Sequence, residues 1–444
     1  MAGILRPVTA LLLSAAILLM GNGLLSVLGP IRADTENFTR LDIGIMGSCY
    51  FAGLMLGCLL WPRIIATVGH IRAFSALTAI ATITPLAQAV WPVPIVWWGL
   101  RGLNGLAFAG LFMVIESWLN GSSSTETRGR VLAGYTILNL TVVTVGMQLV
   151  VVGEPTSFEL FTLYSLAAVP LALAPASAPS APRAVKLRLG WLMSVSPAAV
   201  LGCFGTGLAN ASFWTLGPIY ATGAGMRARD AALFLTAAVL GGAVSQWPVG
   251  WLSDRIGRRP MAMIVCISAA VAGLGLYAAS TESKSIVLPL GAFYGAAAFT
   301  VYTLCVAHAN DLVHKKRAVE VSSGLLLVFS MGAVIGPLIA SFMMRELGHG
   351  ALFLHSAIAH LGIASIMILR TQQRPKLPVE RNEPFVSVPK TTPAVFDLDP
   401  RGERQGDPGQ EDDAAAPLVG LAASVRVCRR PPSCPHEATP DKAM

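Results

Sequence analysis

The decapeptide Gly250–Arg259, GWLSDRIGRR, separates two apolar runs of the chain, 231–252 and 261–279. A related junction lies 188 positions earlier, where Pro62–His70 reads PRIIATVGH and again separates two apolar runs. A short polar junction between runs of about 20 apolar residues is typical of two membrane-spanning helices joined by a loop. The two copies indicate that the sequence repeats a membrane-spanning unit.

The repeat extends beyond this junction. Gly53 recurs as Gly241 at the same offset of 188, and Gly105 recurs as Gly295 at an offset of 190. Further pairs at these offsets are Gly69 with Gly257, Ala107 with Ala297, and Asn120 with Asn310. Membrane transporters with internal repeats place their substrate site between the repeated halves. We therefore expect two matching sets of six helices with a binding cavity between them.

The composition also indicates an integral membrane protein. Hydrophobic residues make up 54% of the chain and charged residues 13%, whereas soluble proteins carry about 25% charged residues. The mean hydropathy is +0.63. The apolar runs predict an all-α membrane protein with twelve spans, at 7–29, 42–61, 72–91, 95–119, 131–152, 158–177, 192–220, 231–252, 261–279, 285–309, 320–344 and 350–369.

The positions of these spans predict four regions. An N-terminal six-helix bundle at 1–177 precedes a cytoplasmic linker at 178–191 and a C-terminal six-helix bundle at 192–370. Residues 371–444 are rich in Pro, Gly, Arg, Glu and Asp. Because such a segment has little apolar surface to bury, we expect a disordered cytoplasmic tail.

The distribution of basic residues predicts the orientation in the membrane. One set of loops carries thirteen basic residues: Arg63, Arg72, Arg128, Arg130, Arg183, Lys186, Arg188, Arg255, Arg258, Arg259, Lys315, Lys316 and Arg317. The opposite loops carry six: Arg32, Arg40, Arg227, Arg229, Lys284 and Arg345. The more basic loops face the cytoplasm in membrane proteins. We therefore expect both termini in the cytoplasm, and we read the net charge of +8 as a topology signal, with no nucleic-acid partner.

The junction Gly250–Arg259 has the pattern G-x-x-x-D-R-x-G-R-R, which resembles the signature loop of the major facilitator superfamily. Gly250 allows close helix contact, Asp254 can cap a neighbouring helix N-terminus, and Gly257 permits a tight turn. Arg255, Arg258 and Arg259 can pair with carboxylates on adjacent helices. The resemblance implies that these six residues form a conformational latch; the alternative is a basic turn that serves topology alone. In the earlier copy Ala66 and Thr67 replace the Asp and Arg, so a latch there would have to use His70 or Arg72.

Helix 4 contains an arginine within an apolar run. Arg101 begins the stretch RGLNGLA, which resembles the R-x-x-x-G-x-G pattern of the same superfamily, with Ala107 at the last glycine. An arginine inside the bilayer is costly and tends to face a cavity. Arg101 either faces the substrate or proton pathway or extends to the outer interface.

Glu116 lies near the predicted inner end of helix 4. A carboxylate at that depth requires a partner, and Arg128 and Arg130 in the following loop are the nearest cations in sequence. We expect these three residues to form a cytoplasmic gate network. The alternative is a role for Glu116 in the substrate site.

Polar and aromatic side chains at mid-depth are the candidates for the substrate or proton pathway. Each candidate has the alternative role of a hydrogen-bonding contact between helices. Besides Arg101, they are Asn22, Asn104, Asn139, Gln148, Asn210, Trp214, Gln246 and Tyr302.

Longer segments resemble the YcaD-like branch of the superfamily, including Tyr50–Gly53, Val114–Ser117, Arg128–Tyr135 and Gln246–Gly250. The resemblance covers about residues 5–370 and implies a monomeric secondary transporter of a small molecule in a bacterial inner membrane. It also implies alternating access, and protons are a candidate coupling ion. No phosphate-binding G-x-x-x-x-G-K-[ST] loop occurs, which argues against an ATP-driven pump. We expect no cofactor, no metal and no enzymatic activity. The alternatives to a transporter are a receptor or scaffold with the carrier fold and, less favoured because no cluster of acids, histidines or metal ligands occurs at catalytic depth, a membrane-embedded enzyme.

Overall fold

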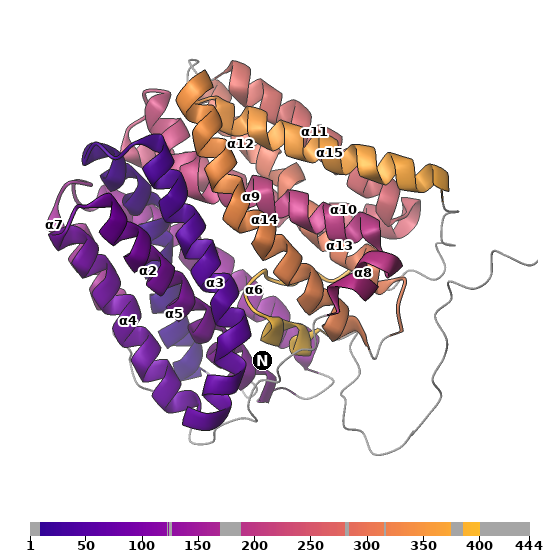
Figure 1. Cartoon of the computed structure of the whole chain (residues 1–444), viewed down its shortest axis with the longest axis horizontal. Coiled ribbons are helices and arrows are strands. Elements are labelled where there is room, and N and C mark those ends of the chain that lie inside the picture. Colours follow the sequence, from indigo (N-terminus) through magenta and orange to yellow (C-terminus); the bar gives the residue numbers. More distant parts are fainter. Residues whose placement is uncertain are drawn as a thin grey trace, which may run out of the picture. The chain divides into compact units, whose positions relative to one another are not determined.

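The computed structural model describes residues 9–121, 123, 127–168, 188–279, 284–314, 317–373 and 385–399, and these are helical almost throughout (Figure 1). The α-helices are α2 (Thr9–Thr35), α3 (Arg40–Val68), α4 (His70–Val90), α5 (Pro94–Gly121), α6 (Arg128–Gln148), α7 (Phe158–Ala168), α8 (Leu189–Val195), α9 (Pro197–Gly223), α10 (Ala228–Ile256), α11 (Arg258–Ala278), α12 (Lys284–Ala298), α13 (Val301–Asn310), α14 (Ala318–Leu347) and α15 (Ala351–Gln373). Two short 3₁₀ helices are η2 (Leu149–Val151) and η5 (Pro393–Leu398).

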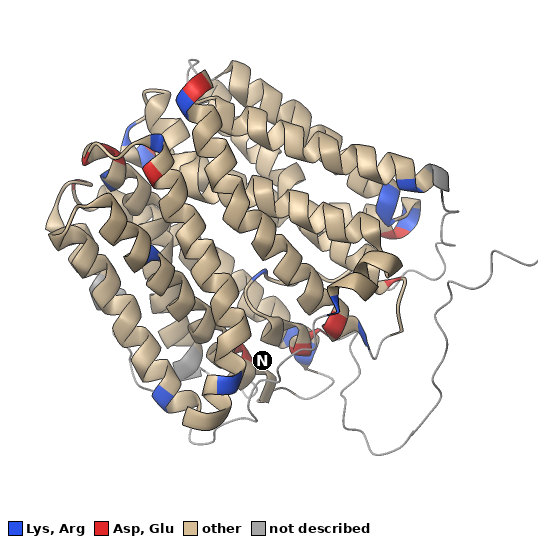
Figure 2. Cartoon of the chain, viewed as in Figure 1, with Lys and Arg blue, Asp and Glu red and all other residues tan. Residues whose placement is uncertain are grey.

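Each predicted span falls on one helix or on two consecutive helices. Within the described part of the chain, ten helices are long and apolar enough to cross a membrane, and the bent pair of α8 and α9 makes an eleventh candidate. The sixth predicted span falls on α7, which is described as far as Ala168. Most Lys, Arg, Asp and Glu residues lie toward the helix ends, and few lie in the middle of the helices (Figure 2). The all-α membrane fold is confirmed, whereas the domain boundaries at 177, 191 and 370 stay predictions.

Two predicted spans are not single straight helices. The span at 192–220 is interrupted at Ser196, where α8 and α9 bend by 114°. Pro197 begins α9 because proline has no N–H to donate and suits the first turn of a helix. The span at 285–309 is divided into α12 and α13 around Phe299 and Thr300. Hydropathy alone does not detect either break because the residues on both sides are apolar.

The repeated junctions have the same backbone geometry. Gly69 lies between α3 and α4 with φ +87°, and Gly257 lies between α10 and α11 with φ +96°. This region of φ is open to glycine at little cost. Each glycine ends one helix and begins the next, so both halves turn their second helix directly into their third. We call the side of the membrane that carries these two turns the basic side.

Glycines also set how closely the helices approach within each half. A Cβ on Gly53 would lie 2.0 Å from the carbonyl oxygen of Gly102, and one on Gly105 would lie 2.0 Å from that of Tyr50. The second half repeats the contact: Gly241 meets Ala292 at 2.0 Å and Gly295 meets Ala238 at 1.9 Å. Helix pairs α3–α5 and α10–α12 therefore touch backbone to backbone, as small residues allow in membranes.

The other helix pairs follow the same symmetry. In the first half α2 packs on α6 and α7, and α4 packs on α7; in the second half α9 packs on α14 and α15, and α11 packs on α15. Gly23 and Gly146 bring α2 and α6 together, as Gly207 and Gly332 do for α9 and α14. The internal repeat seen in the sequence is thus a repeat of packing.

Replacement of Gly295 by Ala tests this packing. The new Cβ would overlap a backbone carbonyl that has no rotamer to change, so we expect a loss of at least about 1–3 kcal/mol in stability and a lower Tm in detergent. Gly134→Ala is the matched control, because a Cβ on this helical glycine meets no atom within 4 Å. Equal Tm values for the two variants, measured by fluorescence-detected size-exclusion chromatography after heating, would contradict the account.

Candidate functional site

The two halves contact each other on the side opposite the basic side. A Cβ on Gly44 of α3 would lie 2.1 Å from Ser341 Oγ of α14, and one on Gly47 would lie 2.2 Å from the Thr215 side chain of α9. Gln148, at the end of α6, donates a 2.7 Å hydrogen bond to Thr236 Oγ1 near the start of α10. All three contacts lie near the helix ends that are remote from Gly69 and Gly257. The halves are therefore closed together on this side.

On the basic side a C-terminal segment lies between helices of the two halves. Residues 385–399 are extended and then form η5, which contacts α5 and α6 of the first half and α14 of the second (Figure 1, yellow). Val395, Phe396 and Leu398 are each at most 1% exposed. The expectation of a disordered tail is therefore wrong for residues 385–399, because this stretch carries apolar side chains that the composition of 371–444 as a whole conceals. Residues 374–384 and 400–444 lie outside the described residues.

Glu116 is the polar centre of this region. Its side chain is fully buried in α5. Oε1 accepts hydrogen bonds from the hydroxyls of Tyr135, at 3.3 Å, and Thr391, and Oε2 accepts one from Thr392. The hydroxyl of Tyr135 also interacts with Asn139, one of the predicted pathway residues.

The expected gate network of Glu116 with Arg128 and Arg130 is not observed. Arg130 is exposed and Arg128 is buried, and neither is among the hydrogen-bond or ion-pair partners of Glu116. Hydroxyl groups from the C-terminal segment take the place that loop arginines were expected to fill. Sequence distance misled the prediction, since two of the three partners, Thr391 and Thr392, are 275 and 276 positions away.

Lys390 extends from the same segment toward the second half. Its Nζ lies 5.1 Å from the ring centroid of Tyr302 and 5.4 Å from that of Phe329, within range of a cation–π contact. Cys203 and Cys305 are close enough to interact electrostatically with the amine. Tyr302, a predicted pathway residue, is thus brought next to a charged group.

Two of the predicted latch residues, Asp254 and Arg258, form an ion-pair chain with Asp311 at the turn between α10 and α11. Arg258 Nη1 lies 2.5 Å from Asp254 Oδ1, and Arg258 Nε lies 3.1 Å from Asp311 Oδ2. The side chains of Arg258 and Asp311 are 2% and 3% exposed. Arg258 also donates to Ser253 Oγ at 2.6 Å. Arg255 lies outside this chain, with its guanidinium 3.7 Å from the Trp251 ring centroid.

Asp254 and Gly250 also contact the C-terminal segment, at Phe385. Asp254 Oδ2 accepts a hydrogen bond of 3.4 Å from the backbone N–H of Phe385. A Cβ on Gly250 would lie 2.3 Å from the Phe385 ring. The predicted helix-capping role of Asp254 and the predicted helix contact of Gly250 are therefore replaced by contacts with Phe385.

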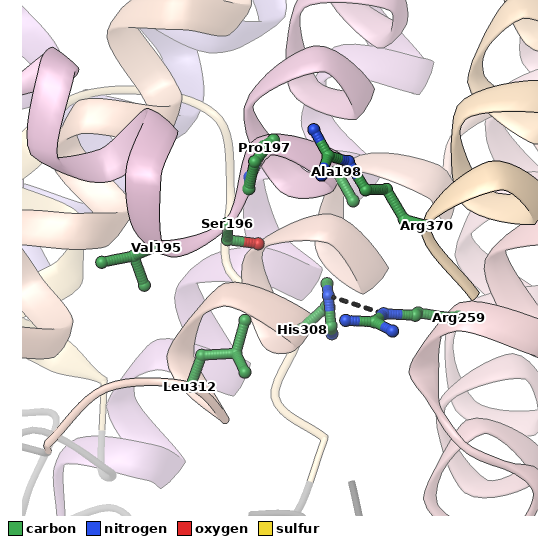
Figure 3. A pocket seen from close by; sticks show the side chains of 8 residues that line it. All are labelled: Val195, Ser196, Pro197, Ala198, Arg259, His308, Leu312 and Arg370. Carbon is green, nitrogen blue, oxygen red and sulfur yellow. Dashed lines mark hydrogen bonds between the residues drawn. The ribbon is translucent and has the colours of Figure 1, made fainter. Parts of the chain in front are cut away.

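A small basic pocket lies beside the latch (Figure 3). It is lined by Val195, Ser196, Pro197, Ala198, Arg259, His308, Leu312 and Arg370. Arg259 Nε donates to His308 Nε2 at 3.3 Å, so His308 offers that nitrogen as an acceptor. The residues at the break between α8 and α9 thus line a pocket together with two arginines, Arg259 and Arg370. Arg259 is one of the six predicted latch residues.

Arg101 lies inside the first half and does not reach the outer interface. It is 9% exposed, and its guanidinium lies 4.7 Å from the Tyr50 ring centroid. Asn22 interacts with the Tyr50 hydroxyl. Asn104 donates to Thr84 at 3.0 Å and to Tyr164 at 3.4 Å. Asn22, Arg101 and Asn104 are thus gathered in one polar cluster, in which Asn104 also ties neighbouring helices together.

The remaining pathway candidates are dispersed. Gln148 belongs to the contact between the halves, Trp214 stacks on Phe299 with rings 9° from parallel, and Gln246 donates to the Phe299 carbonyl at 3.4 Å. Asn210 is 2% exposed. The residues that the sequence analysis missed are Tyr135, Asp311 and Lys390–Thr392. A signal existed only for Asp311, which directly follows the repeated Asn310.

Comparisons with known proteins agree with this architecture. The family model of the Major Facilitator Superfamily matches residues 11–323 and 230–417. An uncharacterised MFS-type transporter of Yersinia enterocolitica is 27% identical over 397 residues, covering 86% of this chain and 99% of the relative. The uncharacterised MFS-type transporter YcaD of Shigella flexneri is 27% identical over 387 residues, covering 84% and 98%.

Solved structures show the same fold at low identity. The nucleoside transporter NupG has a TM-score of 0.70 at 15% identity, covering 82% of this chain and 99% of that one. A D-xylose–proton symporter has a TM-score of 0.65 at 13% identity, covering 84% and 98%.

Replacement of Arg258 by Met tests the latch. It leaves the buried Asp311 carboxylate without its guanidinium, and breaking such a buried pair costs about 3–5 kcal/mol, so we expect a clearly lower Tm. Arg255→Met is the matched control, since Arg255 lies against Trp251, which is 46% exposed. A Tm for Arg258→Met equal to that of the control would show that the ion-pair chain is not formed.

Proposed function

The chain belongs to the Major Facilitator Superfamily, and from this premise we propose that it moves a small solute across the membrane by alternating access. Members of this family are membrane transporters and not enzymes, and the chain is accordingly a multi-pass transporter with YcaD-like relatives. The proposal is carried by one observation: the halves touch on one side of the membrane, whereas on the other side a separate segment lies between them.

The asymmetry corresponds to one end state of a rocking cycle. A transporter with two repeated halves exposes its central site to one side at a time, by rotation of one bundle against the other. In the state described, the contacts at Gly44, Gly47 and Gln148 close the side opposite Gly257. We place the basic side in the cytoplasm, from the excess of arginine and lysine in its loops, so this state faces inward.

The latch would set the relative stability of the two end states. Asp254, Arg258 and Asp311 are linked only while the ends of α10, α11 and α13 lie as they do here. All three residues belong to the second half, so rocking of the two halves leaves this ion-pair chain intact. The ion-pair chain favours the inward-facing state by holding Asp254 in place for the backbone N–H of Phe385, whose segment lies between the halves.

Proton coupling would require an acid that changes its partners during the cycle. Glu116 is a buried carboxylate held by three hydroxyl groups and by no guanidinium. Removal of the two threonine hydroxyls would leave it with Tyr135 alone, which disfavours the charged form in a low-dielectric site. Glu116 is therefore the residue that we propose for proton uptake, with the bacterial inner membrane as the setting.

The function is tested first by ligand-dependent thermal stabilisation. Purified protein is heated with a panel of metabolites and drugs at two pH values, and each compound that raises the Tm is then measured for uptake into proteoliposomes. We expect at least one stabilising compound to be transported. Binding without flux for every stabilising compound would instead support a receptor with the carrier fold.

Alternating access predicts that joining the halves stops transport. In the variant Gln148→Cys/Thr236→Cys, a short thiol-reactive cross-linker should span two positions whose native side chains are 2.7 Å apart and hold this side closed. We expect uptake of a transported compound to fall at least about tenfold and to return after reductive release. Gln148→Cys alone, treated identically, is the control. Unchanged uptake in fully cross-linked protein would contradict alternating access.

A further inference from the structure

The C-terminal segment presents ligand-like groups to polar residues between the halves. Thr391 and Thr392 each give a hydroxyl to a different oxygen of Glu116. Lys390 places its amine over the aromatic rings of Tyr302 and Phe329. One short peptide stretch thus contacts α5 in the first half and α13 and α14 in the second.

The threonine hydroxyls of this segment and the Glu116 carboxylate satisfy each other's hydrogen-bonding groups. Without it, the buried Glu116 would lose two of its three hydrogen bonds, and leaving a buried acceptor without its donors costs about 1–3 kcal/mol. Donor groups from another molecule could replace those of Thr391 and Thr392. The site is therefore built for an occupant that brings hydroxyl donors.

Among the residues that the structure describes, no carboxylate pairs with the Lys390 amine, which lies over two aromatic rings instead. Tyr302 is 1% exposed and Phe329 is 8% exposed, so the amine lies in a largely desolvated place, where the rings offset part of the cost of burying its charge. Aromatic faces attract an ammonium group by their negative potential. The carboxylate oxygens of Glu116 therefore bind the hydroxyl groups of an occupant. The rings of Tyr302 and Phe329 bind its amine.

The free energy that holds the docked segment is limited by the entropic cost of ordering it. Burial of Phe396 and Leu398 contributes about 1.5–3 kcal/mol for each side chain. Ordering the backbone costs about 1–2 kcal/mol for each residue. Over residues 385–398 this cost is larger than the contribution of the two side chains, so their burial alone does not hold the segment irreversibly.

Docking is also connected to the latch. Phe385 donates its backbone N–H to Asp254 and packs its ring against Gly250. Release of the segment would remove both contacts from the turn between α10 and α11. Release of the segment from Glu116 and Tyr302 therefore also loosens the residues that favour the inward-facing state.

We propose that residues 385–398 are a tethered ligand of the transport site, and that the solute which replaces them is a hydroxyl-bearing amine. This rests on the proposal that the space between the halves is the transport site. The segment mimics the solute with its own hydroxyls and amine. It must leave before the solute can enter, so the tail inhibits its own carrier.

Cutting the folded chain tests the tether. A protease recognition sequence placed within 374–384 allows the tail to be removed from folded, purified protein. Native Cys58 is the reporter, because its Sγ lies 4.0 Å from the Thr391 carbonyl oxygen. We expect labelling of Cys58 by a water-soluble maleimide, followed by mass spectrometry, to accelerate at least about tenfold after cutting, since thiol reactivity follows access. Equal rates before and after cutting would overturn the proposal.

A peptide added in trans separates occupancy from a change in fold. The peptide with the sequence of residues 385–399 should slow Cys58 labelling of the cut protein back toward the uncut rate. The same peptide with Lys390→Ala, Thr391→Ala and Thr392→Ala should not. A peptide with Ser387→Ala is the matched control and should act like the native one. Equal protection by the triple-alanine peptide would contradict recognition through these three side chains.

Three matched compounds test the solute class on the cut protein. Glucamine carries hydroxyls and an amine, sorbitol carries the hydroxyls alone, and hexylamine carries the amine alone. We expect glucamine to slow Cys58 labelling at a concentration at least about tenfold lower than either analogue, a difference of about 1.4 kcal/mol. If all three act equally, the assigned class of solute is wrong.

Two outcomes separate the solute class from the carrier function. If another compound from the panel is transported but glucamine does not bind, the solute class is wrong and the carrier function stands. If glucamine binds and no compound is transported, the carrier function is wrong.

The affinity of the segment should depend on pH in a predictable direction. Burial lowers the pKa of Lys390 to about 8, against the opposing effect of Cys203 and Cys305, whereas a free lysine has a pKa of about 10.4. Between these values the docked form binds fewer protons than the free form, so affinity rises with pH from about 8 to about 10 and is constant below. Tyr302, Cys203 and Cys305 also face the amine. A Lys390→Met peptide is therefore the control, and its affinity should not rise with pH. If its affinity rises as that of the native peptide does, the pH dependence belongs to Tyr302, Cys203 or Cys305 and not to Lys390.

Discussion

Backbone contact at repeated glycines is the constraint on which the rest of this structure depends. In a bilayer, apolar side chains gain nothing by leaving lipid for a helix interface, so helices associate through close packing. Gly53 and Gly105 in the first half, and Gly241 and Gly295 in the second, let carbonyl groups take the place of side chains. Each half is thereby a tightly packed body. Two such bodies can move against each other without repacking their interiors, which is what a rocking carrier requires.

The two sides of the interface between the halves differ. On one side Gly44 and Gln148 bring the halves together. On the basic side the chain supplies a segment from beyond the last helix, and its hydroxyls satisfy Glu116. A buried carboxylate between moving bodies must have a partner in each state. In this account the partner is the tail in the resting state and the solute during transport.

The sequence predicts the fold far better than the site. Apolar runs and the offsets of 188 and 190 predict the helices, their repetition in two halves and the turn at Gly257, because these follow from local spacing. The breaks at Ser196 and Thr300 were missed because apolar residues flank both. Glu116 was recognised as a residue in need of a partner, yet its partners were misassigned. Thr391 and Thr392 are distant in sequence and lie in a region of polar composition, so no local pattern identifies them.

The central claim is that the halves rock about a site that the C-terminal segment occupies from the basic side in this state, and distances between spin labels test it most directly. One pair is placed on that side at Val68 and Ile256, and another on the opposite side at Val152 and Leu347; all four positions are exposed. The account predicts that a transported compound shortens the first distance and lengthens the second in the same sample. Two distances that stay unchanged during confirmed binding, or that move in the same direction, would contradict it.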